Sequence, residues 1–74
     1  MRIHSFTLVV QELSDEQIDA VAGRCSDSGT GTRSGETYVD FDREAPSLGA
    51  AIDSAMSDLA SLGITVLQIR VDEL

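Results

Sequence analysis

The spacing of the apolar residues changes several times along the chain, and the order of these changes constrains the fold most strongly. Residues 2–10 alternate in the manner of a strand. Residues 14–25 and 46–62 have the three-and-four spacing of amphipathic helices. Residues 37–42 and 64–71 alternate again. The sequence therefore predicts strand, helix, strand, helix and strand, with one unassigned segment after the first helix.

The first strand and first helix have clear local signals. The even-numbered positions of His4–Val10 form the more apolar face, which should point at the core, with His4 as a partly buried packing residue. Ser14 is predicted to cap the helix, and Gln17 to complete a capping box. Leu13 and Ile18 occupy the positions of a hydrophobic staple. The stripe predicted to be buried comprises Ile18, Val21, Ala22 and Cys25.

The segment from Ser26 to Gly35 is rich in glycine and has no clear pattern. It is either a flexible loop or a glycine-weakened edge strand that closes a hairpin at residues 33–35. In the second helix Pro46 suits the first turn, and Gly63 suits the position just past the end. In the last strand, alternation predicts that one set faces the core, namely Leu67, Ile69 and Val71.

This order of elements predicts the α+β class with a single domain over residues 1–74. Right-handed crossovers place both helices on one face of one sheet, which gives a ferredoxin-like βαββαβ sandwich with an antiparallel sheet. The first and third strands are then central, and the second and last are edges. If residues 26–35 form a loop, a simpler βαβαβ sheet is the alternative.

The charge balance is acidic and excludes several classes of partner. Thirteen carboxylates oppose five basic residues, all of them arginine, for a net charge of −8. Such a surface repels phosphate backbones and anionic membranes, so we expect neither direct nucleic-acid binding nor membrane binding. A single cysteine excludes an internal disulfide. Because no stretch resembles a signal peptide or a membrane span, we expect a cytoplasmic protein.

The sheet face without helices, called here the open face, is the first candidate site. Ferredoxin-like sheets can stack RNA bases on this face, but one tyrosine among aspartates makes a poor platform for a phosphate backbone. A protein docking against Tyr38, Val9 and Val66 is the more plausible interpretation. The residues predicted on this face are Ser5, Thr7, Val9, Tyr38, Asp40, Asp42, Val66, Gln68 and Arg70.

Other motifs point away from catalysis, metals and cofactors. Asp40 and Asp42 share a strand face about 7 Å apart, but a cation needs further oxygen ligands, so a solvated pair is favoured. Residues 29–35 superficially resemble a phosphate loop but lack its lysine and lead into a strand. Cys25 on an apolar stripe should be a small packing residue with a raised pKa. A chain this small is also expected to form hardly any cleft.

The two edge strands differ in their protection against pairing. The last strand ends with Arg70, Asp72 and Glu73, charges that guard an edge. The glycine-rich second strand has only Arg33 beside Gly31. We therefore expect the second strand to be the place where a partner or a second copy adds a strand.

Several stretches also resemble a known kind of protein. The most specific reads YVDFDREAPSL at residues 38–48, and the others are residues 6–10, 51–52, 62–66 and 71–74. Together they resemble the N-terminal domain of small high-GC bacterial proteins in which a helix-turn-helix follows. The resemblance implies an accessory or assembly domain of a DNA-binding or antitoxin-like regulator, and no catalytic residue. The helix-turn-helix has no counterpart in this sequence.

The sequence thus predicts a non-enzymatic protein-interaction or regulatory module that associates with itself or with another protein. A domain of this size buries only about 60% of its unfolded surface, so association would add stability. The predicted contact residues are Tyr38, Asp40, Asp42, Val9, Val66, Gly31 and Arg33. The alternative is an acidic inhibitor or antitoxin-like neutraliser of a basic protein, acting through Asp40, Asp42, Asp53 and Asp58.

Overall fold

Strands and helices follow one another in the predicted order in the computed structural model, which describes residues 1–71. The four strands form one antiparallel sheet in the order β2-β3-β1-β4. The predicted ferredoxin-like α+β fold is therefore confirmed, with β1 and β3 at the centre. The elements are β1 (Arg2–Val10), α1 (Asp15–Arg24), β2 (Ser28–Arg33), β3 (Glu36–Ala45), α2 (Leu48–Ser61) and β4 (Val66–Val71).

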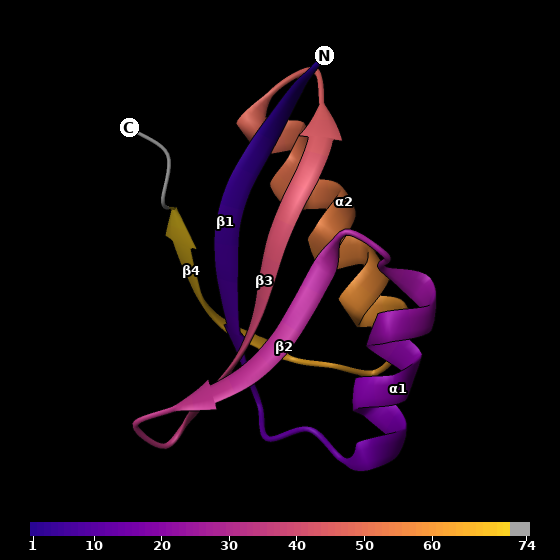
Figure 1. Ribbon diagram of the computed structural model, residues 1–74, viewed down its shortest axis with the longest axis vertical. Coiled ribbons are helices and arrows are strands. Elements are labelled where there is room, and N and C mark those ends of the chain that lie inside the picture. The colour runs from indigo at the N-terminus through magenta and orange to yellow at the C-terminus, as the bar shows by residue number, and fades with distance from the viewer. Residues whose placement is uncertain (72–74) are drawn as a thin grey trace.

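The helices cover only part of the sheet. In Figure 1, α2 lies behind β3 and β1, and α1 lies near the β2 side, while β4 forms the opposite margin. The packing agrees, because α2 contacts mainly β3 and β1, and α1 contacts mainly β2. One face of the inner strands is thereby closed, and β4 is left with β1 as its main neighbour.

The glycine-rich segment is a strand and not a loop. β2 pairs with β3 along its whole length, from Ser28 opposite Phe41 to Arg33 opposite Glu36. The connection has two residues, Ser34 and Gly35, with φ of 51° and 79°. Positive φ at both central positions is the mark of a type I′ hairpin turn, whose twist matches that of the strands. Because residues 28–33 form a strand and not a loop, the alternative βαβαβ sheet is excluded.

The first helix begins as predicted but buries less than predicted. Ser14 caps it, and the capping box with Gln17 is present in both directions. Val21 and Cys25 are fully buried, whereas Ile18 and Ala22 are exposed, so the predicted stripe is only half buried. The reason is the position of α1 beside β2, because a helix at the margin of a sheet has sheet under only one side.

The second helix supplies most of the helical core. Ser47 caps it and the helix starts at Leu48, so Pro46 lies before the cap and the prediction that it belongs to the first turn is wrong. Gly63 follows the helix with a φ of 75°, as predicted for the position just past its end. On the sheet side, the rings of Phe6 and Phe41 stack with centroids 5.3 Å apart. The buried core cluster comprises Phe6, Leu8, Val10, Val21, Cys25, Val39, Phe41, Ala45, Ala51, Ala55, Leu59 and Ile64.

The last strand departs from its predicted phase because of a β-bulge. Pairing with β1 shifts between Val9 and Val10, so that Val66 lies opposite the core residue Val10. Opposite residues in antiparallel strands share a face. Val66 therefore packs against the core, and the prediction that it lies on the open face is wrong. A bulge inserts one residue, which reverses the phase of alternation on its far side.

A largely buried arginine side chain joins three parts of the chain on the helix side of the sheet. Arg43 of β3 donates from Nε and Nη2 to the two carboxylate oxygens of Asp27, at 2.7 and 3.0 Å. Its Nη1 donates to Asp58 Oδ2 at 3.0 Å and to Ser54 Oγ at 3.1 Å, both on α2. The guanidinium also lies 5.0 Å from the centre of the Phe41 ring. We call Arg43, Asp27, Asp58 and Ser54 the Arg43 cluster.

The Arg43 cluster shifts the pKa values of Asp27 and Arg43 and of the neighbouring Cys25 thiol. Hydrogen bonding to Arg43 lowers the pKa of Asp27 below its ordinary value, and bonding to Asp27 raises the pKa of Arg43. Burial, followed by the nearby Asp58 carboxylate, raises the pKa of the Cys25 thiol, as the sequence predicts. Asp58 also lies 3.5 Å from Arg24 Nε. Asp58, one of the carboxylates named for the acidic neutraliser, is therefore engaged by two arginines.

Replacing Arg43 should destabilise the domain far more than replacing a surface arginine. The Arg43 side chain is 12% exposed, and Arg43→Ala leaves Asp27 without its cation and Asp58 with only Arg24, at 3.5 Å. We expect a loss of about 2 kcal/mol in the free energy of unfolding, less than for a fully buried pair because both aspartates retain some solvent. Arg70→Ala, at an exposed ion pair with Glu36, should cost less than about 1 kcal/mol. Urea unfolding of both variants measures the difference, and equal losses would contradict the role given to the cluster.

Candidate functional site

Cross-strand contacts between β1 and β3 organise the open face. Ser5 Oγ donates to Asp42 Oδ1 at 2.6 Å, and Thr7 Oγ1 donates to Asp40 Oδ1 at 2.5 Å. Each pair consists of residues directly opposite each other in the register. Both aspartates are exposed and hydrogen-bonded to hydroxyls, in agreement with the solvated interpretation. Within residues 1–71, no group of three histidine, cysteine, aspartate or glutamate side chains could hold a metal ion.

Tyr38 lies across the glycine-rich strand. A Cβ atom built on Gly31 would come within 2.5 Å of the Tyr38 Oη and 2.6 Å of Cζ. Gly31 is directly opposite Tyr38, so the missing side chain makes room for the phenol ring. Two of the predicted contact residues therefore touch each other, and the ring covers β2 backbone that glycine would otherwise expose.

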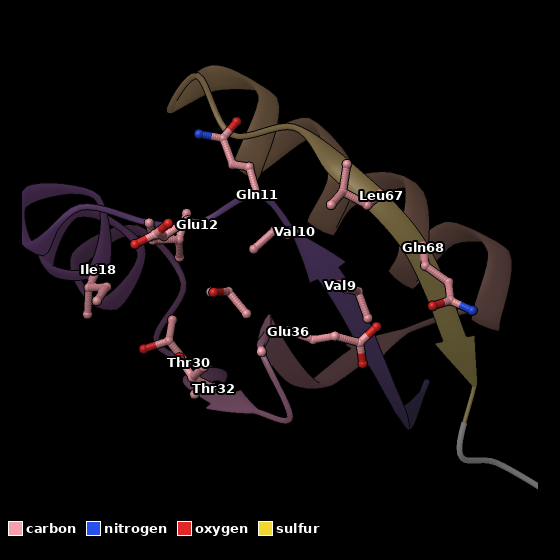
Figure 2. Close-up of a pocket in the computed structure, with 14 residues that line it drawn as sticks. Val9, Val10, Gln11, Glu12, Ile18, Thr30, Thr32, Glu36, Leu67 and Gln68 are labelled. Atoms are coloured by element: carbon pink, nitrogen blue, oxygen red, sulfur yellow. The ribbon is translucent and has the colours of Figure 1, made fainter.

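Val9 lies on the open face but is not available to a partner. It is opposite Tyr38 on one side and Gln68 on the other, and it is only 4% exposed. Arg70 Nη2 donates to Glu36 Oε1 at 2.9 Å, an ion pair between β4 and β3 that bridges over the central strand β1. Figure 2 shows Val9 beside the Glu36 side chain. The prediction that Val9 offers an apolar docking contact does not fit this burial.

The described residues form at least two hollows, although the sequence predicts hardly any cleft in a chain this small. A hollow of about 460 Å³ on the open face gathers three predicted contact residues, Tyr38, Asp40 and Arg33, together with Arg70. Its full lining is Thr7, Arg33, Ser34, Glu36, Tyr38, Asp40 and Arg70. A second, of about 950 Å³, lies at the end of the sheet between the start of α1, the hairpin and β4 (Figure 2). Its charged lining residues are Glu12 and Glu36, and no described histidine, cysteine or arginine lines it.

His4 and Cys25, the only residues of their types, are both packed inside. His4 is 4% exposed on β1 and lies opposite Arg43 in the register. Cys25 is 1% exposed at the end of α1, and its Sγ donates to Asp58 Oδ2 at 3.7 Å. The packing role predicted for both is confirmed by this burial.

Three exposed apolar side chains gather on β4, where the sequence did not place them, whereas the other large exposed apolar residues, Met1, Ile3, Ile18 and Met56, are spread over the N-terminal end and the two helices. Leu67, Ile69 and Val71 are 65%, 43% and 46% exposed, and we call them the apolar β4 strip. Ile69 and Val71 lie opposite the core residues Leu8 and Phe6, so they have the predicted direction but no helix above them. Alternation reveals the face of a strand but not whether a helix covers it, so no signal in the sequence could have shown this exposure.

The open face also carries a row of exposed carboxylates along β3. Asp40, Asp42 and Glu44 occupy alternate positions of the strand, and all three are exposed. Arg33 lies at the other end of this face, next to the hairpin. The predicted contact residues thus fall into three places. Near the hairpin end of the open face lie Tyr38, its strand neighbour Val9, Gly31 and Arg33; the two aspartates lie farther along β3; and Val66 lies on the opposite face.

Comparison with known proteins identified no relative of this chain. A scan of protein-family models, a search of curated proteins and a search of solved structures each gave no match. Neither helix in the described part of the chain has the length and apolar character needed to cross a membrane.

The contact between Gly31 and Tyr38 predicts unequal effects of two glycine substitutions on one strand. Gly31→Ala forces the Tyr38 ring away from β2 and should lower the free energy of unfolding by about 1 kcal/mol. Gly29→Ala meets no atom within 4 Å, so it should be neutral or stabilising by up to about 1 kcal/mol, because alanine has less freedom in the unfolded chain. Urea unfolding compares the two. In a Tyr38→Ala background the difference should vanish, and its persistence would contradict the steric explanation.

Proposed function

We propose that this domain is a non-enzymatic protein-interaction module that associates with itself. The observation that carries the proposal is the apolar β4 strip, whose three large side chains are exposed along a strand with an unpaired outer edge. Such an edge offers backbone donors and acceptors to another strand, and exposed apolar side chains make that pairing favourable. Covering the strip would extend a core that is small for four strands.

A regulatory role is supported by the sequence resemblance alone. The stretch at residues 38–48 covers most of β3 and the start of α2, so the residues that carry the resemblance include Tyr38 and Arg43. In the proteins that the chain resembles, such a domain precedes a helix-turn-helix. An assembly domain that brings two copies together would suit a regulator of that kind, and the cytoplasmic location predicted from the sequence belongs to the same proposal.

A second candidate is the acidic neutraliser of a basic protein. It is favoured by the exposed row of Asp40, Asp42 and Glu44 and by Asp53, which is exposed on α2. Asp58 does not contribute, because it is bound to Arg43. Attraction between these carboxylates and a basic partner weakens as salt screens it. Association between two copies that each carry a charge of −8 strengthens instead, because salt screens their repulsion.

Sedimentation velocity over a range of protein concentrations tests self-association. We expect a shift from monomer to dimer as the concentration rises, and a larger fraction of dimer in about 0.5 M salt than in about 0.05 M salt. A strict monomer at millimolar concentration in both buffers would overturn the proposal. A purified complex with a basic protein that dissociates in high salt would favour the neutraliser instead.

A further inference from the structure

We propose that two copies pair through the outer edges of their β4 strands, antiparallel, with Ile69 of one copy opposite Ile69 of the second. This inference rests on the proposed self-association and adds the surface and the register. The result is one continuous sheet across both copies, related by a two-fold axis perpendicular to it. In such an arrangement each copy offers the same patch, which must be complementary to itself.

The two edges of the sheet offer very different surfaces to a second copy. β2 contains serine, glycine, threonine and arginine only, so pairing there buries no large apolar side chain. On its open side the Tyr38 ring already covers Gly31. β4 has three large apolar side chains that are between 43% and 65% exposed. The hydrophobic contribution to pairing is therefore available at β4 and missing at β2, contrary to the expectation from the glycine content.

The order of side chains in β4 is self-complementary about Ile69. Residues 67–71 alternate apolar and polar, reading Leu-Gln-Ile-Arg-Val. In the proposed register Leu67 lies opposite Val71 of the second copy, and Gln68 lies opposite Arg70 of the second copy. Cross-strand apolar pairs and amide–guanidinium pairs are both favourable neighbours. Every apolar residue of the strip thus meets another apolar residue.

Neighbouring two-fold registers are less favourable. An axis at Arg70 brings the two Arg70 side chains directly opposite each other, and like charges in that position destabilise the pair. An axis at Gln68 puts Arg70 opposite Val66 of the second copy and leaves Val71 opposite residue 65, outside β4. A shift by one residue would join the helix face of one copy to the open face of the other, since side chains alternate. Ile69 is the centre that the sequence pattern selects.

The charge distribution also favours β4 over the rest of the surface. The whole chain carries −8, yet Arg70 is the charged residue of β4, and Glu36 balances it at 2.9 Å. Two copies that meet along β4 therefore bring no carboxylate of the strand itself against another, and the carboxylates nearest in sequence are Asp72 and Glu73. The row of Asp40, Asp42 and Glu44 on β3 is separated from the edge by β1.

Engineered cysteines test the register directly. Paired residues in antiparallel strands have Cα atoms about 4.5 to 5.5 Å apart, within the range of a disulfide. We expect Ile69→Cys to form a covalent dimer under mild oxidation at concentrations where the unmodified protein dimerises. Val71→Cys should not, because the two substituted positions would lie about 13 Å apart along the strands. A mixture of Leu67→Cys and Val71→Cys should give the heterodimer. Cys25 is 1% exposed, and the unmodified protein controls for its oxidation.

The outcomes separate this inference from the proposed function. If sedimentation shows a dimer but Thr30→Cys on β2 cross-links and Ile69→Cys does not, self-association stands and the β4 interface is overturned. Cross-linking of Val71→Cys to itself in place of Ile69→Cys would overturn the register. A strict monomer would overturn both proposals. Leu67→Lys, at the most exposed position of the strip, should shift the dissociation constant at least tenfold without loss of the circular dichroism of the folded domain, and Thr32→Lys on β2 should leave it unchanged.

Discussion

The Arg43 guanidinium is the interaction on which the arrangement of this domain depends. One side chain from the central strand β3 binds Asp27, at the junction of α1 and β2, and Asp58 and Ser54, on α2. These bonds hold the helical layer on the β3 side of the sheet. A helix of ten residues and one of fourteen cannot cover four strands from that position. The strand left uncovered is β4, so Ile69 and Val71 lie on the same face as the Arg43 cluster but at the margin that the helices do not reach.

The two edge strands of the sheet, β2 and β4, differ in how much apolar side-chain surface they expose. At β2, the Tyr38 ring packs directly against Gly31 and fills the space that a side chain at this position would occupy. At β4, apolar side chains that point toward the core side have no helix above them. On the open face the Arg70–Glu36 pair and the bonds from Ser5 and Thr7 engage most of the polar groups. The proposed pairing through the β4 edge rests on this distribution of apolar surface, and the carboxylates of the open face lie away from that edge.

Much of the fold could be predicted from the sequence, because the signals are local. Alternation in β1 and β3, the Ser14 capping box and the positive φ of Gly63 all depend on nearby residues. Two features depend on distant ones. The bulge that turns Val66 inward arises only from pairing with β1, and the partners of Arg43 come from elements that are remote in sequence. The candidate site was therefore predicted only in part: Tyr38 and Gly31 meet as neighbours on one face, whereas the apolar β4 strip could not be foreseen from periodicity.

Amide hydrogen exchange at β4 tests the central claim most directly. Backbone N–H groups on the outer edge of an unpaired strand exchange rapidly, and a second strand protects them. The account predicts that outward-pointing amides of β4 become slow as the protein concentration rises through the dimerisation range, while those of the β2 outer edge stay fast. Protection that appears on β2 instead, or β4 exchange that is independent of concentration while the protein sediments as a dimer, would contradict it.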